Sequence, residues 1–453
     1  MKILIISPAG FLYEKGEHFV RLMRYAPLSI TTLASLVPKE LNAKIRLIDE
    51  VVEKTDYSKL NPDLVAISIL TPAAEKGYIL ADYFRKRNIP VVLGGVHPTL
   101  MHEEAKQHAD AIVLGYGEET WPKLLMDFKN GKMKKVYRTS KDFSLDKKVI
   151  VNRSLLKPYS YVLKNTIESS RGCNNHCNFC TISSAYGNHL SKPLDNVINE
   201  IKALKGKTFV FIDSNLNVNK EYSYKLFKRI KPLKKLWGGS STISDLQNEK
   251  LLDSMAESGC RGVLIGFETV NQDSLDFANK GFNNVENYKK IIQKIKKRGL
   301  LITGTFILGI DSDKKDIFDK TIKFVNNSGI DIPVFMIYTP FPGTPLFKNI
   351  ESEGRIIEKS WSLYDFNHVV FKPKNMSAEE LQEGIRKVWK NVYSHKNILK
   401  RLSHSGRNFP ISLLANYGYW NFSRNFSKYT PKVIKKMKNK YAERLRIKNK
   451  KKF

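Results

Sequence analysis

The sequence predicts an α/β protein in two parts, a doubly wound parallel sheet followed by a partial (β/α)6 barrel, with a basic helical C-terminal tail. Two observations support this. Short apolar runs alternate with helical stretches over most of the 453 residues, which is typical of parallel sheets covered by helices. From about Met376 onward the pattern is helical and basic. The expected divisions are residues 1–140, a linker at 141–163, a barrel at 164–375 and an extension at 376–453.

The first division is expected to be a flavodoxin-like or Rossmann-like sheet. Its expected strands are residues 2–7, 44–49, 63–69, 90–94 and 109–114, and its expected helices are residues 28–41, 73–87 and 118–128. Ligands of such sheets bind at the carboxyl ends of the strands. Three loops there are rich in small or hydroxylated residues, namely 68–72, 94–99 and 115–118. Such residues let the backbone approach a bulky ligand and offer hydrogen bonds.

The second division continues the same alternation and is expected to form the barrel. Its expected strands are residues 166–170, 208–213, 236–243, 262–268, 301–308 and 332–338, and its clearest helices are residues 193–204, 249–258, 285–298 and 314–327. Six strands make a partial barrel whose site lies at the strand ends. Polar residues and glycines occur there, which an apolar strand does not need. They are Asp213, Asn215, Ser240, Ser241, Thr242, Glu268, Gly304 and Gly309.

Three of the four cysteines are spaced C-x3-C-x2-C, as Cys173, Cys177 and Cys180. Structural zinc sites and ordinary electron-transfer clusters use four protein ligands. Three thiolates leave one iron of a [4Fe-4S] cluster open, so that it can bind a substrate or cofactor directly. The alternative is a zinc site completed by His176 or His189. The fourth cysteine, Cys260, is expected near the end of a helix as a packed small residue, with extra ligation as its alternative.

The cysteine loop follows an expected strand and resembles that of the radical S-adenosyl-L-methionine (SAM) enzymes. The resemblance implies that the amino and carboxylate groups of SAM bind the fourth iron. It also implies SAM contacts at the polar strand ends, where Glu268 and the serines would reach the polar groups of SAM and the glycines would leave room for adenine. A glutamate at a strand end is also commonly a neighbour of a helix N-cap. The expected SAM contacts are Phe179, Asp213, Ser240, Ser241, Glu268 and Gly304.

The three loops of the first division, in this order ahead of the cysteine motif, resemble the cobalamin-binding domain of the B12-dependent radical SAM family. No Asp-x-His-x-x-Gly occurs, so the resemblance implies a corrinoid whose lower face is covered by the loop around Leu70 and Thr71. His97 is interpreted as a loop-shaping residue, with axial ligation as the alternative. The expected corrinoid contacts are Ser68, Leu70, Thr71, Gly94, Gly95, His97, Gly115, Gly117 and Glu118. Generic nucleotide binding is the alternative for this domain, but no G-x-G-x-x-G follows the first strand.

The resemblance covers about residues 1–370 and includes the run 339–346, which matches a recurrent sixth-strand loop of the group. It implies methylation of an unactivated carbon through a 5'-deoxyadenosyl radical and methylcobalamin. A second hypothesis is ring closure or carbon–carbon bond formation on a membrane lipid, and a third is a non-catalytic corrinoid or redox sensor. The expected partners are an electron donor such as ferredoxin or flavodoxin and a substrate that is a lipid, a protein side chain or a small metabolite.

The net charge of +32 is unevenly spread, and from Arg424 onward the basic residues meet one acid, Glu443. The preceding segment carries apolar residues among Arg407, Arg424 and Lys428, and predicts an amphipathic segment lying in a membrane interface. These residues are Ile411, Leu413, Leu414, Tyr417, Trp420, Phe422 and Phe426. RNA binding by the lysine run and a merely solvated tail are the alternatives, and a nucleic-acid partner is not the favoured expectation.

The sequence also favours a reducing compartment. No window approaches an 18-residue apolar run, and neither a spanning helix nor a signal peptide is evident. Four cysteines exclude a disulfide scaffold in a chain of this size, and an accessible iron–sulfur cluster needs reducing conditions. We therefore expect a protein of the cytoplasm of an organism living with little oxygen, with peripheral contact to the inner face of the membrane.

Overall fold

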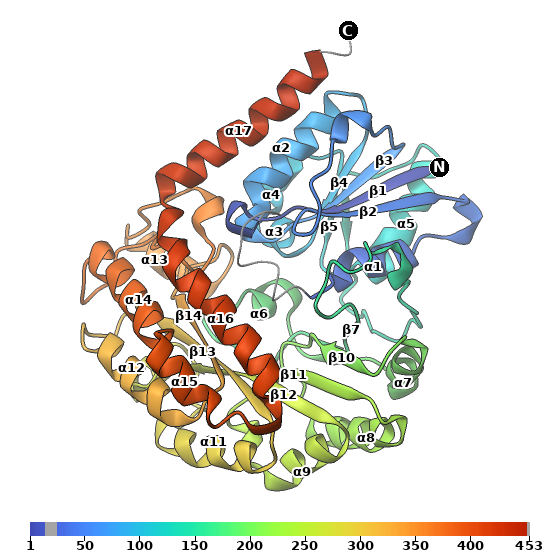
Figure 1. Cartoon of the computed structure of the whole chain (residues 1–453). Helices are drawn as coiled ribbons and strands as arrows, with labels where there is room; N and C mark the ends of the chain where they lie inside the picture. The colour runs from blue at the N-terminus through green and yellow to red at the C-terminus, as the bar shows by residue number, and fades with distance from the viewer. Residues whose placement is uncertain (14–24, 451–453) are drawn as a thin grey trace.

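The computed structural model describes residues 1–13 and 25–450, apart from the side chains of Phe426 and residues 447–450. Phe426 and the basic residues Lys448 and Lys450 to Lys452, which belong to the expected tail, therefore lie outside the described side chains. Within the described part, the strands form two six-stranded parallel sheets and a two-stranded antiparallel hairpin. Figure 1 shows the first sheet and the barrel as separate layers of one molecule. The α/β prediction is confirmed.

The first sheet has the strand order β2-β1-β3-β4-β5-β6. Its strands are β1 Lys2–Ser7, β2 Lys44–Asp49, β3 Leu64–Ser68, β4 Val91–Gly94, β5 Ala111–Leu114 and β6 Val136–Arg138. Helices α1 Leu28–Ser35 and α5 Gly117–Lys129 pack on one face, and α2 Ala74–Arg85 packs on the other. Five strands agree with the prediction. The sequence analysis missed β6, a three-residue edge strand, and placed the end of α1 too late, because Pro38 interrupts the expected helix at 28–41.

The expected loop at 94–99 is helical over most of its length, which corrects the prediction. Helix α3 Val96–Leu100 begins directly after Gly95, and α4 His102–Gln107 follows it. Gly95 has a φ of +99°, a conformation that favours glycine, and this turns the chain from β4 into the helix. Pro98 lies in the first turn of α3, where a missing N–H breaks no helical hydrogen bond. His97 is therefore a helical residue.

The barrel sheet has the strand order β14-β13-β12-β11-β10-β7. Its strands are β7 Thr166–Ile167, β10 Thr208–Phe211, β11 Leu236–Thr242, β12 Cys260–Glu268, β13 Leu301–Leu308 and β14 Ile332–Ile337. The expected strand at 166–170 is divided, because the chain leaves β7 and forms a hairpin from β8 Ser170–Arg171 and β9 Leu190–Ser191.

Helices cover the outer side of the barrel sheet and form one apolar core with it. They are α7 Leu194–Ala203, α8 Lys220–Ile230, α9 Glu249–Glu257, α11 Tyr288–Lys297 and α12 Ile317–Ser328, with the short α6 Thr181–Tyr186 and α10 Gln272–Phe277 in the loops. The sequence analysis missed α6, α8 and α10. Its placement of Cys260 was also wrong, since this residue is the first of β12 and is fully buried.

The C-terminal region is helical, as predicted, but it packs on both sheets. Its helices are α13 Pro345–Ser352, α14 Ala378–Val392, α15 His395–Leu402, α16 Phe409–Asn425 and α17 Pro431–Lys450. Helix α14 packs on α12, and α16 packs on α14. Helix α17 returns to the first sheet and contacts α2, as Figure 1 shows for the red helices. None of the helices in the described part of the chain combines the length and apolar character needed to cross a membrane.

Candidate active site

A cavity of about 420 Å³ lies between the carboxyl ends of the first sheet and the cysteine side of the barrel. From the first domain it is lined by Ser68, Leu70, Gly94, Gly95, Gly115, Gly117 and Glu118. From the barrel side it is lined by Arg171 and Gly172, which directly precede Cys173. Seven of the nine residues that the sequence analysis expected to contact the corrinoid therefore line one cavity. The same cavity reaches the start of the loop that was expected to hold the cluster.

The glycines that line this cavity let a bulky ligand approach the backbone closely. An added Cβ at Gly95 would lie 2.9 Å from the backbone of Ile69, and Gly115 has a φ of +86°, so neither position accepts a larger residue without strain. The cavity continues as an apolar slot between the sheet and α1, past Leu36 and Val113. Leu70 stands at its mouth with 63% of its surface exposed. These features suit cobalamin, with Leu70 available to cover one face of the ring.

Two of the expected corrinoid contacts lie away from the cavity. His97 is fully buried, and its Nδ1 lies 3.2 Å from Oγ1 of the buried Thr71. Its Nε2 lies 3.7 Å from Glu104, and its ring packs edge-on against Trp361. This arrangement agrees with His97 as a loop-shaping residue, and it gives Thr71 the role of a partner to His97.

The cysteine loop combines two buried thiols, Cys173 and Cys177, with the partly exposed Cys180. Burial raises the pKa of Cys177 to about 12 and also raises that of Cys173. Both thiols are therefore protonated at neutral pH without a metal, and binding of iron must release their protons. Three deprotonated sulfurs on one short loop are the donor set of a [4Fe-4S] cluster with an open iron.

Asn178 holds this loop against the barrel. Its side-chain oxygen accepts a 2.6 Å hydrogen bond from the Tyr338 hydroxyl, at the end of β14, and its backbone oxygen accepts from the N–H of Leu346. Its side-chain nitrogen donates to the carbonyl of Phe277 in α10. Phe179, the next residue, packs edge-on against the ring of Tyr338. The sequence analysis missed Asn178 and Tyr338, although the matching run at 339–346 begins one residue later.

The other candidate ligands of a metal are placed elsewhere. His176 is exposed, and Nε2 of His189 lies 2.9 Å from the Ser191 hydroxyl. Cys260 begins β12, whereas the cysteine loop lies at the carboxyl ends of the strands, roughly 26 Å away at the usual rise per residue. Its Sγ donates to the Gly262 carbonyl, and burial raises its pKa to about 12. Cys260 is a packed residue, as predicted.

A buried ion pair lies beside the cysteines. Glu268 ends β12 with a φ of +65°, and its carboxylate pairs with the ammonium of Lys280. Both side chains are less than 10% exposed. They pack against Gly266, where an added Cβ would lie 2.7 Å from Nζ of Lys280. Burial alone would lower the pKa of Lys280, but Glu268 and the nearby Cys177 and Cys180 hold it above its ordinary value. The sequence analysis missed Lys280, because a single lysine in a loop carries no pattern.

The remaining expected SAM contacts divide between the two sides of the barrel sheet. Ser240 is partly exposed and pairs in register with Leu264, which is 43% exposed. Ser241 is buried on the other side, where its hydroxyl accepts from Asn217. An added Cβ at Gly304 would lie 3.0 Å from the ring of Phe267, so the missing side chain of this glycine makes room for Phe267. Glu268 and Ser240 are therefore the strand-end residues that face the barrel interior.

Asp213 lies behind the cysteine loop and does not line the cavity. It is 2% exposed and accepts hydrogen bonds from the Ser169 N–H, from the Ser169 hydroxyl at 2.6 Å and from the Ser170 hydroxyl at 2.7 Å. Burial raises its pKa to about 6. Asp213 thus fixes the turn between β7 and β8 that leads into the cysteines. Asn215 and Thr242 share a different partner, the carboxylate of Asp245.

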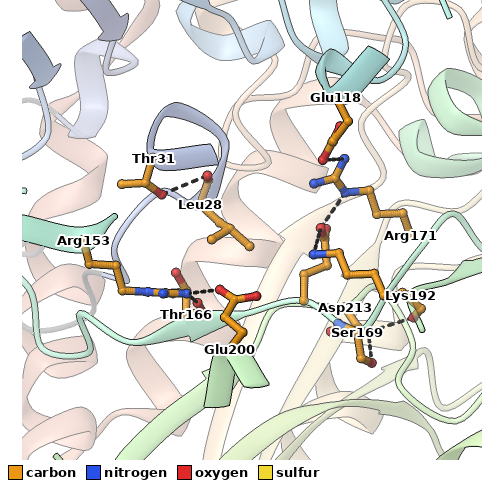
Figure 2. A network of polar contacts seen from close by, with 12 residues as sticks. Leu28, Thr31, Glu118, Arg153, Thr166, Ser169, Arg171, Lys192, Glu200 and Asp213 are labelled. Carbon is orange, nitrogen blue, oxygen red and sulfur yellow. Dashed lines mark hydrogen bonds and ion pairs between the residues drawn. The ribbon is translucent and has the colours of Figure 1, made fainter. Parts of the chain in front are cut away.

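A network of charges joins the two domains at the cavity, as Figure 2 shows. The Arg171 guanidinium lies 2.7 Å from the carboxylate of Glu118 in α5 and 2.5 Å from that of Glu168. Lys192 lies 3.6 Å from Glu168. The Tyr116 hydroxyl donates to the carbonyl of Tyr186, and the two rings stack. The loop at 115–118 is therefore bonded directly to the segments on both sides of the cysteines.

Three family models match the chain in succession. The B12 binding domain matches residues 30–125, the radical SAM superfamily matches residues 167–325, and a domain of unknown function, DUF4070, matches residues 344–416. The first two matches contain the cavity loops and the cysteine loop respectively.

Curated relatives extend the similarity over most of the chain. A bacteriochlorophyllide d C-12(1)-methyltransferase of Chlorobaculum tepidum is 32% identical over 412 residues, covering 86% of this chain and 88% of the relative. A bacteriochlorophyllide d C-8(2)-methyltransferase of the same organism is also 32% identical, covering 86% and 90%. The solved structure of the radical SAM methyltransferase TsrM from Kitasatospora setae shares the fold, with a TM-score of 0.68, 14% identity and coverage of 94% and 98%.

Proposed function

The chain belongs to the family of cobalamin-binding radical SAM enzymes, and on that premise we propose that it methylates an unactivated carbon. The observation that carries the proposal is the cavity, which is lined by the glycine-rich loops of the first domain on one side and by residues on both sides of the three cysteines, Arg171, Gly172 and Tyr186, on the other. The names of both 32%-identical relatives describe carbon methylation, which supports the same reaction here.

When bound, the cluster with SAM would supply a radical for hydrogen abstraction, and the corrinoid would supply the methyl group. In our proposal the protein's part is geometric. Cys173, Cys177 and Cys180 hold three irons, and Glu268, Lys280 and Ser240 offer polar groups to SAM. Two exposed apolar side chains, Ile212 at the cavity and Leu264 on the Ser240 side of the barrel sheet, would help to exclude water from the reacting carbon.

On the corrinoid side, we propose that Ser68, Gly94, Gly95, Gly115 and Gly117 contact the cofactor. In this proposal Leu70 covers the lower face of the ring and no protein histidine ligates the cobalt. We also propose that the domains end at residues 140, 163 and 375, as expected from the sequence.

Two partners complete the proposal. An electron donor such as ferredoxin or flavodoxin would reduce the cluster, and the net charge of +32 suits the acidic surfaces of such carriers. Peripheral contact with the inner face of a membrane is supported by the cationic C-terminal region. The substrate would be a lipid, a protein side chain or a small metabolite.

Anaerobic reconstitution tests the function. The protein is loaded with iron, sulfide and hydroxocobalamin, reduced with dithionite and given SAM, and 5'-deoxyadenosine is measured. Cys177→Ala should abolish this product and leave the corrinoid bound, because Cys177 does not line the corrinoid cavity. Cys260→Ala is the matched control and should retain activity, since this thiol is packed at the opposite end of β12.

The outcome of this experiment can contradict the proposal at either cofactor. Production of 5'-deoxyadenosine by Cys177→Ala would refute the cluster assignment, and wild-type protein that binds no corrinoid would refute the cavity assignment. With a candidate substrate, product mass separates the reactions: methylation adds one methylene unit, whereas ring closure removes hydrogens.

A further inference from the structure

Helices α15 and α16, which contact each other, expose six large apolar side chains, which we call the α15–α16 apolar face. Its members are Leu399, Phe409, Ile411, Leu413, Leu414 and Tyr417. Leu399 and Ile411 are each 61% exposed, Leu414 is 49% exposed and Phe409 is 45% exposed. Figure 1 shows both helices on the outside of the barrel, beside α14. Contiguous exposed apolar surfaces on soluble folds commonly mark interaction sites.

The fold of the chain does not depend on this face, because the opposite side of α16 anchors the helix. Ala415 and Tyr419 are buried in the core of the barrel. The buried Asn416 donates to the carbonyl of Asp331 and accepts from the guanidinium of Arg401 at 2.9 and 3.0 Å. Phe422, which the sequence analysis assigned to the membrane, also belongs to this inner side. The exposed side chains of α16 are therefore available for a partner.

The surroundings of the face carry positive charge. From residue 393 to residue 428, the segment that contains α15 and α16, the sequence has six lysines and arginines and no acid. On α15, Lys396 is exposed one turn before Leu399 and Lys400 is exposed directly after it. On α16, Arg424 lies over the ring of Trp420. Exposed aliphatic side chains beside cations, with aromatic rings between them, match the boundary between the headgroups and acyl chains of an anionic bilayer.

Helix α17, the most lysine-rich segment, is positioned differently. Its apolar residues Ile434, Tyr441 and Leu445 are buried against the first domain, and Lys438 pairs with Glu75. Helix α17 therefore contributes positive charge to the protein surface, but these three apolar residues are not available to contact a membrane. The face that can enter a lipid layer is on α15 and α16.

We propose that the α15–α16 apolar face docks the enzyme on an anionic membrane, with Lys396, Lys400 and Arg424 contacting lipid headgroups. The inference rests on the membrane contact in the proposed function, and it adds the surface that makes the contact and the class of lipid that it selects. Binding then has two parts, burial of aliphatic side chains and attraction to negative charge, and each part can be removed separately.

Co-sedimentation of the full-length protein with vesicles tests the proposal. Wild-type protein should bind vesicles of phosphatidylcholine with phosphatidylglycerol and should bind pure phosphatidylcholine weakly. The triple variant Ile411→Ser, Leu413→Ser, Leu414→Ser should partition about a thousandfold less, since each of the three buried aliphatic side chains contributes roughly tenfold. The matched control is Ile150→Ser, Val162→Ser, Ile357→Ser, which removes three apolar side chains that are 45–54% exposed elsewhere, and it should bind like wild type.

A second variant isolates the charges. Lys396→Glu combined with Lys400→Glu should weaken binding to anionic vesicles and reduce its salt dependence. Vesicle binding by the Ile411, Leu413 and Leu414 variant at the wild-type level would overturn the proposal, as would equal wild-type binding to both lipids. A wild-type dimer that this variant converts to a monomer would assign the face to a second copy. Formation of 5'-deoxyadenosine in detergent-free solution should be the same in all variants, so loss of docking and loss of the proposed reaction are separate results.

Discussion

Replacing Lys280 with methionine should destabilise the protein strongly. Removing the charge of Glu268 as well should recover most of the lost stability. The two side chains form an ion pair in which each is less than 10% exposed. Removing one partner of such a buried pair leaves an uncompensated charge and costs about 3–5 kcal/mol. Methionine is apolar and unbranched like the lysine stem, so the missing ammonium accounts for most of the expected loss.

The double variant Lys280→Met, Glu268→Gln tests this explanation. It removes both charges and should unfold with a free energy within about 1 kcal/mol of wild type, because buried ion pairs contribute little net stability. Glu268→Gln alone leaves the ammonium of Lys280 unpaired and should also cost about 3–5 kcal/mol, so the coupling energy between the two positions should be at least about 5 kcal/mol. The exposed pair Arg298–Asp253 is the control, and Asp253→Asn should cost at most about 1 kcal/mol.

Urea unfolding of the four chains of this cycle, cluster-free and under reducing conditions, measures the coupling. A double variant no more stable than Lys280→Met would refute the reasoning, since the penalty would then come from lost packing and not from the charge on Glu268. SAM affinity can be measured on the same proteins after cluster loading. It should fall in both single variants if this pair faces the SAM site.

Two further predictions concern Asp213 and Gly304. Burial raises the pKa of Asp213 to about 6 from 3.8, so the folded protein gains stability below about pH 4 and loses it as the pH rises through about 6. In Asp213→Asn, the free energy of unfolding should fall less steeply with pH between about 4 and 6, as measured by urea titrations at a series of fixed pH values. The same dependence on pH as in wild type would contradict the raised pKa of Asp213. Gly304→Ala should cost about 1–3 kcal/mol, because the new methyl meets the ring of Phe267, and should leave SAM affinity in calorimetry unchanged. Weaker SAM binding at unchanged stability would instead support the adenine role.

The sequence was informative where local pattern decides structure. Alternation of apolar and helical segments predicted both parallel sheets, and cysteine spacing with glycine-rich loops selected the two sides of one cavity. It was less informative where the face of a strand matters. Ser240 and Ser241 are adjacent, and only the register of β11 against β12 shows that Ser240 shares a side with the exposed Leu264. For the same reason, the sequence alone could not distinguish Gly304 from a glycine that faces a ligand.

Contacts between distant segments could not be predicted at all. Lys280 meets Glu268 through the path of a loop, and Arg171 meets Glu118 across two domains, so neither pair leaves a periodic signal. The helical prediction for the C-terminal region was confirmed, but its packing was not foreseen. The basic residues of α17 dominate its sequence, whereas the few apolar ones determine where it lies.

The position of α17 affects how the chain can fold during synthesis. One face of the first sheet shares its core with Tyr364, Val370, Tyr441 and Leu445, all of which leave the ribosome long after β1 to β6. One face of the amino-terminal sheet therefore stays partly uncovered until α17 has been synthesised, a state that favours aggregation or chaperone binding. Removing α17 should accordingly impair the folding of the amino-terminal half of the protein.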